Sequence, residues 1–376
     1  MKEKAKAVNT YILINIILIL IFVLVAGLGY MYWKMYGTSE IIVAGENTET
    51  TNIAKENVEK VEESKKIEAI TPSITDNATN EATVANKQIK YYYNQLDNNS
   101  KKIYDSIERN IENLKTGKYT INLPSDLSSL IADGNDFSAL NKCFQSAWDA
   151  IIMDMVELFY IDISKVELNI KTVTSGNSTK YYLTIGAKEN SNYLEDGFEN
   201  EEDVKDASTK LNNIRNGIIA QLTGDTYNKI LQIHDCIVDN IEYGTEISGH
   251  NSYNIYGALV NKSAVCEGYA ESFKYIMDAL NIPCILVVGE ATNSNGTTES
   301  HEWNYVQIDG KWYAVDTTWD DPILVNGYLT NNIKYKYFLV GSNVIDTNHF
   351  PNGKVSQNGI SFTYPALEKE KYTNGN

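Results

Sequence analysis

Apolar residues recur at helical spacing in the first half of this 376-residue chain and again just beyond its middle. Four such stripes, each typical of an amphipathic helix with one buried face, lie at 103–114, 137–155, 203–222 and 225–241. A strand pair is also predicted, because alternating apolar positions at 166–170 lead through S-G-N-S to a second run at 181–185. The earlier helices and the hairpin together indicate a small α+β domain.

A further amphipathic helix follows Cys266. The apolar residues behind this cysteine keep helical spacing as far as Leu280, and Pro283 marks the end of the helix. The cysteine therefore lies in the first turn. Unpaired backbone N–H groups and the helix dipole favour an anion there, so a thiolate is stabilised.

A tight hairpin is predicted downstream of this helix. Two β-rich runs at 301–308 and 311–316 are joined by D-G at 309–310, a strong signal for a two-residue turn. With that turn, His301 and Asp316 fall on one face of the hairpin as diagonal neighbours. A turn of another length would shift the register and break this pairing.

A cysteine, a histidine and an aspartate at the ends of regular elements are the parts of an activated thiol nucleophile. His301 would take the proton of Cys266, and Asp316 would hold the imidazole in place. Each of these residues, taken alone, is ordinarily structural. The prediction of a catalytic thiol therefore rests on their conjunction.

Five motifs in the second half of the chain carry a resemblance to a known family. They are I-H-D-C-I-V-D-N-I-E-Y at 233–243, Y-G-A-L-V at 256–260, V-C-E-G-Y-A at 265–270, H-E-W-N at 301–304 and W-Y-A-V-D-T-T-W-D-D-P at 312–322. The stretch at roughly 225–345 resembles the transglutaminase-like superfamily, and more narrowly its bacterial surface members. The resemblance implies a papain-like α+β core, in which the helix carrying the nucleophile packs on an antiparallel sheet. It also implies that Cys266 is the nucleophile, His301 the base and Asp316 its orienting partner.

Four further residues are candidates for substrate binding or oxyanion support: Tyr256, Gly268, Trp303 and Trp319. An acyl-transfer site needs N–H donors for the developing oxyanion, and the backbone N–H of Cys266 is one such donor. A second donor would come from the loop at 242–254, but which residue supplies it stays open. The loop at 292–300 has no apolar anchor and is expected to be mobile beside the site.

The chain divides into six predicted segments. They are a cytoplasmic N-terminus at 1–10, a transmembrane signal anchor at 11–33, a flexible extracellular linker at 34–86, an accessory α+β domain at 87–202, a catalytic domain at 203–364 and a disordered tail at 365–376. The anchor is predicted because residues 7–33 carry no charge, and this uncharged stretch is longer than the ~20 residues needed to span a bilayer. Lysines precede this stretch, so its N-terminal end is expected inside the cell. A cleaved signal peptide is the alternative. One more strand is predicted at 335–340.

The net charge and the motifs of the sequence limit which partners and cofactors are expected. The formal net charge is −17, and this argues against nucleic acid, because phosphate contacts need lysine and arginine. No glycine-rich phosphate loop and no convincing metal-ligand spacing are present, so neither a cofactor nor a metal is expected. The expected partners are protein or peptide substrates at the cell surface and the membrane itself. The oligomeric state and the pairing of Cys143, Cys236 and Cys284 stay open.

Three functions fit these observations. The first is a membrane-anchored extracellular acyltransferase of transglutaminase type, which forms a thioester from a protein amide and passes it to an amine or to water. The second is a cysteine peptidase or amidase of the same fold that acts on surface proteins or cell-wall peptides. The third belongs to another class, a surface binding module without catalytic activity.

Overall fold

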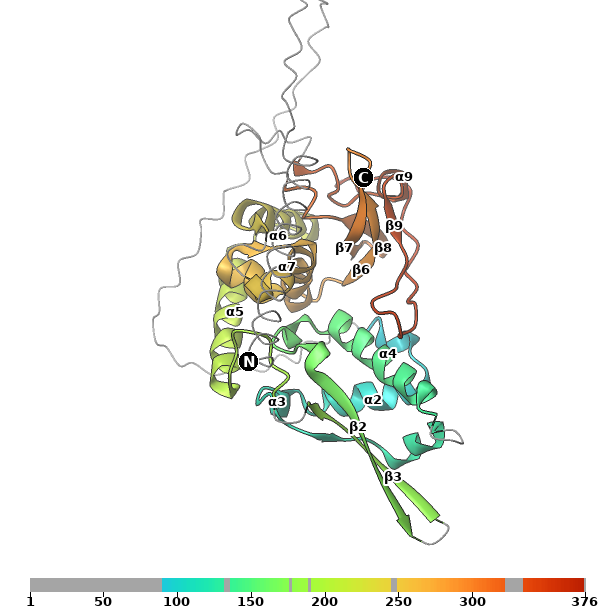
Figure 1. Ribbon diagram of the computed structural model, residues 1–376. Coiled ribbons are helices and arrows are strands. Elements are labelled where there is room, and N and C mark those ends of the chain that lie inside the picture. The colour runs from blue at the N-terminus through green and yellow to red at the C-terminus, as the bar shows by residue number, and fades with distance from the viewer. Residues whose placement is uncertain are drawn as a thin grey trace, which may run out of the picture. The chain divides into compact units, whose positions relative to one another are not determined.

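The computed structural model describes residues 90–131, 136–175, 178–188, 191–244, 249–321 and 334–374, and they form a mixed α/β fold (Figure 1). The predicted cytoplasmic segment, anchor and linker, 1–86, lie outside these residues. No helix within the described ranges is both long enough and apolar enough to cross a membrane.

The first part of the fold combines three helices with a small antiparallel sheet. The helices are α2 (Asn98–Glu108), α3 (Ile111–Leu114) and α4 (Ser138–Asp154), and the strands are β1 (Ile121–Asn122), β2 (Val166–Ser175) and β3 (Ser178–Ala187). The strand order is β1-β3-β2, and β2 and β3 form the predicted hairpin. Figure 1 shows this hairpin projecting away from the helices.

The helix predicted at 103–114 is two helices in the structure. Asp97 starts α2, because its side chain accepts the backbone N–H groups of Asn99 and Ser100. Asn110 leaves the helical conformation between α2 and α3, with φ −117° and ψ 12°. The apolar stripe therefore continues across a bend in the chain.

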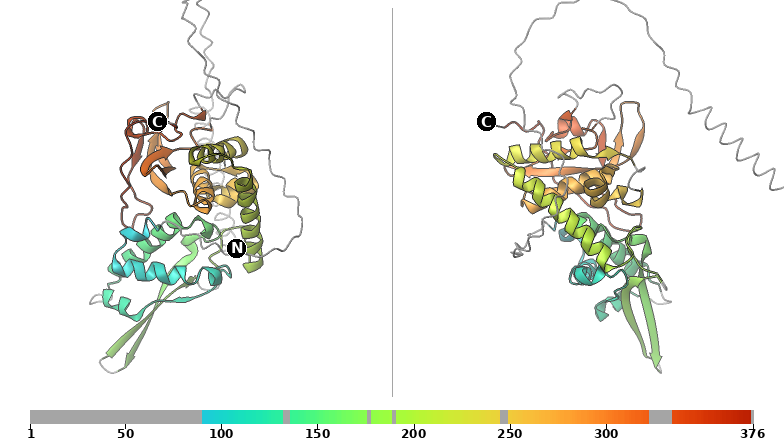
Figure 2. Two further views of the ribbon diagram at one scale, coloured as in Figure 1. Left: turned by 180° about the vertical axis from the view of Figure 1, so that it is seen from behind. Right: turned by 90° about the vertical axis from the view of Figure 1, so that its left-hand side faces the viewer.

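The second part of the fold packs helices against a four-stranded antiparallel sheet. Its helices are α5 (Glu201–Gln221), α6 (Thr226–Asn240), α7 (Cys266–Ala279) and α9 (Ser342–Ile345). The sheet contains β6 (Cys284–Thr292), β7 (Thr298–Ile308), β8 (Lys311–Val315) and β9 (His349–Pro351) in the order β8-β7-β6-β9. Two short parallel strands, β4 (Glu242–Tyr243) and β5 (Ser263–Ala264), lie just before α7 along the chain. Figure 2 shows α5 and α6 from two further sides, next to α7.

The predicted hairpin register is confirmed. Ile308 pairs with Lys311, and the pairs continue regularly as far as Asn304 opposite Val315. Asp309 and Gly310 have φ values of 51° and 77°, the left-handed conformation that a two-residue hairpin turn requires. The turn therefore sets which β7 and β8 residues share a face.

Two clusters of buried apolar side chains hold the fold together. One cluster includes Tyr269 and Phe273 of α7 and the side chains of Val306 and Val315 on the sheet. The other cluster extends from Tyr92 to Phe362, joining the first part of the fold to Trp303, Tyr305 and Ala314 of the sheet. The predicted segments 87–202 and 203–364 thus share one core, and their boundary stays a prediction.

The predicted disordered tail at 365–376 is wrong for the residues that are described. Leu367 forms a bridge with Trp312, and the Glu368 backbone N–H donates to the carbonyl of that tryptophan over 2.9 Å. The Tyr372 ring stacks on Tyr227, 5.7 Å between centroids. The tail is ordered because it covers the free edge of β8, where unpaired backbone groups need partners.

The strand predicted at 335–340 is also absent. Of this stretch only Val340 pairs with the sheet, through an isolated bridge to Ala314. Leu339 adopts φ 47°, which interrupts the extended conformation that a strand requires. The alternating pattern of apolar residues arises because these side chains enter the core at a turn.

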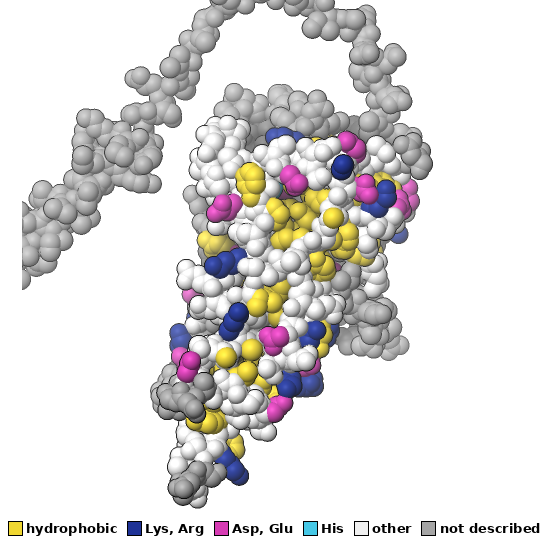
Figure 3. All heavy atoms as spheres, turned by 90° about the vertical axis from the view of Figure 1, so that its right-hand side faces the viewer, with side chains coloured by type: hydrophobic (Ala, Val, Ile, Leu, Met, Phe, Trp, Pro, Cys, Tyr) yellow, Lys and Arg dark blue, Asp and Glu magenta, His cyan; other side chains and the backbone are white. Residues whose placement is uncertain are grey.

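Figure 3 shows one face of the molecule in space-filling form. Basic side chains on this face are interspersed with acidic ones, and apolar side chains form a broken band between them.

Candidate active site

Cys266 is the first residue of α7 and is partly exposed. Val265 precedes it in an extended conformation, and the backbone N–H of Val265 donates to the carbonyl of Ser252 over 2.9 Å. This contact holds the chain as it turns into the helix. The thiol therefore lies at the positive end of the helix dipole while solvent can still reach it.

Gly268 allows the loop before the helix to approach α7. A Cβ at this position would lie 2.8 Å from the Cβ of Ala264 and 3.0 Å from the carbonyl oxygens of Ser252 and Asn254. Gly268 was a candidate for substrate binding or oxyanion support. The structure places backbone there, so the glycine fixes the loop against the helix.

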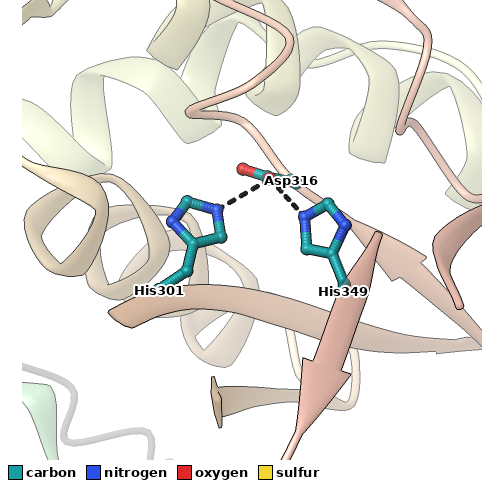
Figure 4. A group of neighbouring side chains, drawn as sticks. All are labelled: His301, Asp316 and His349. Carbon is teal, nitrogen blue, oxygen red and sulfur yellow. Dashed lines mark hydrogen bonds and ion pairs between the residues drawn. The ribbon is translucent and has the colours of Figure 1, made fainter. Parts of the chain in front are cut away.

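His301 and Asp316 are in direct contact, as the hairpin register predicted. The imidazole Nε2 of His301 lies 2.9 Å from Oδ2 of Asp316, and both side chains are buried (Figure 4). Because Nε2 is occupied by the carboxylate, Nδ1 is the ring nitrogen left to receive a proton.

Asp316 receives four hydrogen-bond donors. The backbone N–H groups of Thr318 and Trp319 donate to its Oδ1 over 3.0 and 3.1 Å. Its Oδ2 contacts Nε2 of His301 and Nε2 of His349, each at 2.9 Å. Burial raises the pKa of this carboxyl, but the charge and hydrogen bond of His301 and then those of His349 hold the pKa well below its usual range.

The pKa of His301 is raised although the ring is buried. Burial lowers it, but the charge and hydrogen bond of Asp316, followed by the hydrogen bond and charge of Cys266, raise it to about 10. An imidazolium is therefore stable at neutral pH between a carboxylate and a thiol. This arrangement favours a thiolate on Cys266 by charge attraction.

The two predicted tryptophans lie beside the histidine. The Trp319 ring is 5.2 Å from that of His301, and the Trp303 ring stacks on it at 5.9 Å with planes 21° apart. Tyr256 lies elsewhere: its ring stacks on Phe159 at 6.0 Å. It also packs edge-on against Phe198, 5.4 Å between ring centroids.

Two residues near the site were not predicted from the sequence. His349 binds the same carboxylate oxygen as His301. Tyr243 in β4 is partly exposed, and burial followed by the charge of Cys266 raises its pKa to about 12. Its place at the end of the I-H-D-C-I-V-D-N-I-E-Y motif was a weak signal. No sequence signal pointed to His349, except that histidine is scarce, with 4 in the chain.

His301, Asp316 and His349 are also the group of described residues whose ligand atoms lie close enough together, within 4.8 Å, to hold a metal ion. Aromatic rings surround the group, with Trp319 and Trp303 at 4.6 and 5.0 Å from the His349 ring. Structural zinc sites normally have four protein ligands, and no fourth acidic, cysteine or histidine ligand joins this group within the described ranges. The two 2.9 Å contacts to Asp316 fit hydrogen bonds between two imidazoles and one carboxylate.

A cluster of carboxylates lies behind the nucleophile. Glu267 and Glu271 of α7 line a cavity of about 230 Å³. Burial, then the charge of Glu195, raises the pKa of Glu267 to about 7. Glu302 follows His301 in β7, and burial, then the charges of Glu267 and Glu271, raises its pKa as well. Because the pKa of Glu302 is raised well above its usual range, this carboxyl is protonated at neutral pH and adds no negative charge next to Cys266.

The other cysteines differ from Cys266 in their surroundings. All four cysteines are free thiols, and Cys143 and Cys284 are buried. Burial raises the pKa of Cys143 and Cys284, and raises that of Cys236 to about 11. These three thiols are therefore poor nucleophiles at neutral pH.

His234 of α6 is buried between two carboxylates. Its Nε2 lies 3.0 Å from Oδ2 of Asp320, and its Nδ1 lies 3.2 Å from Oδ1 of Asp235. Asp320 also accepts the backbone N–H of Tyr337 over 2.8 Å. This network joins α6 to the segments on either side of the site.

Comparison with known proteins agrees with this geometry. Residues 212–317 match the family model described as the transglutaminase-like superfamily, and this range contains Cys266, His301 and Asp316. The stretch 212–317 is a transglutaminase-like domain. This match supports a cysteine enzyme.

The similar proteins cover only part of this chain. The kyphoscoliosis peptidase of Mus musculus is 25% identical over 130 residues, which are 31% of this chain and 20% of that protein. This chain therefore spans about a fifth of the length of that curated relative. A crystal structure of a TGase aligns at 14% identity with a TM-score of 0.29, covering 47% of this chain and 50% of the other. The periplasmic domain of TgpA from Pseudomonas aeruginosa aligns at 17% identity with a TM-score of 0.23, covering 38% and 55%.

Proposed function

We propose that this protein is a thiol acyltransferase of transglutaminase type. The observation that supports this most directly is the placement of His301, with Nε2 on Asp316 at 2.9 Å and with Cys266 interacting with the same ring. A thiol, a base and an orienting carboxylate in that order are what nucleophilic acyl transfer requires.

The reaction proceeds in two halves. The thiolate of Cys266 attacks an amide carbonyl carbon, and the C–N bond breaks as the imidazolium of His301 gives its proton to the leaving ammonia or amine. The product is a thioester on Cys266. An amine or a water molecule then gives a proton to His301 and attacks the thioester, which releases the acyl product and restores the thiol.

Asp316 supports both halves without transferring a proton. Its carboxylate stays ionised because four donors hold it, so it stabilises the imidazolium and keeps Nδ1 of His301 toward the thiol. The backbone N–H of Cys266 supports the oxyanion, since it belongs to the first turn of α7.

The test uses the full chain, purified with detergent. We would incubate it with a glutamine-containing protein and a labelled primary amine, beside Cys266→Ala and the control Cys236→Ala. Amine incorporation that disappears in Cys266→Ala and persists in Cys236→Ala supports cross-linking. Cleavage or deamidation without incorporation moves the assignment to the peptidase or amidase alternative, which the peptidase name of the mouse relative favours.

A binding module without catalytic activity is the competing class. It predicts neither product, together with a Cys266 that is alkylated no faster at pH 6 than an ordinary thiol, whose pKa is about 8.5. The intact cysteine, histidine and aspartate argue against this class.

The site is proposed to lie outside the cell, with residues 11–33 as the anchor. This proposal rests on the uncharged stretch 7–33 and the lysines before it. Extraction of cell membranes with carbonate, followed by protease treatment of intact cells, tests it. A protein that is released by carbonate, or protected from external protease, contradicts the anchor.

A further inference from the structure

His349 lies on β9, a three-residue strand that pairs with the edge of β6 through Ala291. Its side chain is fully buried, and its Nε2 lies 2.9 Å from Oδ2 of Asp316. His301 binds the same oxygen from the other side at the same distance. Figure 4 shows the two rings approaching Asp316 from either side.

The second nitrogen of His349 is also occupied. Its Nδ1 lies 2.8 Å from Oδ1 of Asn348, and Nδ2 of that amide donates to the Tyr337 hydroxyl over 2.7 Å. In this orientation both neighbours of the ring are acceptors, so His349 donates from both nitrogens as an imidazolium. If the amide is turned round, Asn348 donates to Nδ1 and a neutral ring results. In both cases Nε2 carries the proton and donates to Asp316.

Aromatic rings keep water away from this network. The rings of Trp319, Trp303 and Tyr337 lie 4.6, 5.0 and 5.2 Å from the His349 ring. Hydrogen bonds and charges act more strongly in such a low-dielectric site than in water. A donor to Asp316 therefore changes how much of the carboxylate's charge reaches His301.

We propose that His349 is a positioning residue that holds the Asp316 carboxylate against His301 and thereby sets how the reactivity of Cys266 depends on pH. The proposal rests on the proposed function for its importance in acyl transfer. The observation behind it is that the imidazoles of His301 and His349 share one carboxylate oxygen of Asp316.

Replacing His349 by a residue without a donor should change the pH dependence of Cys266 reactivity in one defined direction. Without this donor the charge on Asp316 is less dispersed, so more negative charge faces the pair and protonated forms of both partners are favoured. The pH profile of Cys266 alkylation should then move upward by about half to one pH unit, which lowers the rate about 3- to 10-fold on the acid side. The carboxylate also loses one of the contacts that orient it.

Other titratable groups act on this network and must stay unchanged in the comparison. From neighbouring elements they are Asp320, Asp346, Tyr243 and Glu302. Each is present in every variant below, so a difference between variants reports the substituted residue.

The experiment measures alkylation of Cys266 by iodoacetamide between pH 4 and 9, read at the peptide level by mass spectrometry on the full chain. His349→Leu removes the donor, whereas His349→Gln keeps a side-chain N–H. We expect the Leu variant to shift the profile upward by about half to one pH unit and the Gln variant to recover most of the wild-type profile. Tyr104→Phe is the matched control, because it removes another buried donor to a carboxylate, the hydroxyl that contacts Asp154, which is not among the groups that act on this network. Its profile should coincide with that of the wild type.

Three outcomes overturn the proposal. One is a folded His349→Leu whose profile coincides with that of the wild type, and another is a His349→Gln no better than Leu. The third is stoichiometric zinc, measured by plasma mass spectrometry, that is lost with His349 and whose removal by EDTA alters the wild-type profile. If His349→Leu does not fold, His349→Phe takes its place, since its ring occupies the same aromatic surroundings without a donor and should shift the profile in the same direction. An unshifted His349→Phe then overturns the proposal.

Alkylation needs no acyl substrate. A shifted profile without amine incorporation or hydrolysis would support the role of His349 while contradicting the proposed function. Acyl transfer with unshifted alkylation profiles would support the proposed function and contradict the role of His349.

Discussion

Asn304 of β7 donates a hydrogen bond from Nδ2 to the backbone carbonyl oxygen of Ala270 in α7, over 3.0 Å. Asn304 follows His301 on its strand, and Ala270 follows Cys266 on its helix. This single contact therefore ties the element that carries the base to the element that carries the nucleophile.

Replacing this amide should loosen the site. Asn304→Leu is expected to lower the free energy of unfolding by about 1–2 kcal/mol, because it removes a buried hydrogen bond. It should also slow alkylation of Cys266 at pH 6 several-fold, since the helix and strand lose a common anchor. Chemical denaturation and peptide-level alkylation measure the two effects. Gln307→Leu, further along the same strand with only a long 3.4 Å contact to the Gly310 carbonyl, is the control; equal alkylation rates in both variants contradict this prediction.

Asp316→Asn should disable the base. The amide keeps the size of the carboxylate but removes the charge that stabilises the imidazolium of His301. We expect acyl transfer to fall by about 10³-fold or more and alkylation of Cys266 at pH 6 to fall about 10-fold. Asp309→Asn is the control, because asparagine is well suited to this left-handed turn position. Retention of full activity in Asp316→Asn would remove this residue from the mechanism.

The raised pKa of His301 predicts a pH-dependent stability. The folded-state pKa is about 10, above the value of about 6.5 for an unfolded histidine, so the folded protein binds the proton more tightly. The resulting stabilisation is fully present below about pH 6.5 and is lost as the pH rises toward 10. The free energy of unfolding of the wild type should therefore fall between pH 6.5 and 10 by more than that of His301→Gln. Parallel curves for the two proteins, measured by urea titration, would contradict the assignment.

Glu302→Gln should stabilise the protein at alkaline pH. The Oε1 atom of Glu302 is buried without a hydrogen-bond partner among the described residues, and burial followed by the charges of Glu267 and Glu271 raises its pKa. The folded protein therefore holds a proton that an unfolded glutamate, with a pKa of about 4.3, has released. The wild type loses stability as the pH rises above about 4.3, whereas the Gln variant lacks this loss.

The difference between Glu302→Gln and wild type should grow from near zero at pH 4 to on the order of 1–3 kcal/mol at pH 8. Glu299→Gln, exposed on the same strand, is the matched control and should show no such trend. A Glu302→Gln variant that is less stable than wild type at pH 8 would mean that the carboxylate has a partner in solution.

The ordered tail should contribute to stability. Tyr372 donates its backbone N–H to the Leu339 carbonyl over 2.9 Å and packs its ring against Tyr227 and Tyr313. Truncation after residue 364 should therefore lower the free energy of unfolding by about 2 kcal/mol or more, through lost burial and hydrogen bonds. Thermal denaturation measures this, with Lys369→Ala as an exposed control in the same segment. An unchanged melting temperature in the truncated chain would restore the prediction of a disordered tail.

Much of the site could be predicted because it depends on local chemistry. The D-G turn requires left-handed backbone at two positions, and this alone sets the register that brings His301 next to Asp316. Helical periodicity placed Cys266 at the start of α7. Local signals were misleading where the chain turned within an apolar run, as at Asn110 and at Leu339.

The sequence by itself determined the mixed α/β class, the hairpin and the order of nucleophile, base and carboxylate, because turn chemistry and periodicity act between near neighbours. Only the tertiary structure decided that His349 shares the carboxylate with His301, since β9 reaches β6 by pairing between segments far apart in the chain. It also decided that Tyr256 packs on Phe159 and that the tail covers the edge of β8. Such contacts follow from which surfaces bury one another, and no spacing in the sequence encodes that.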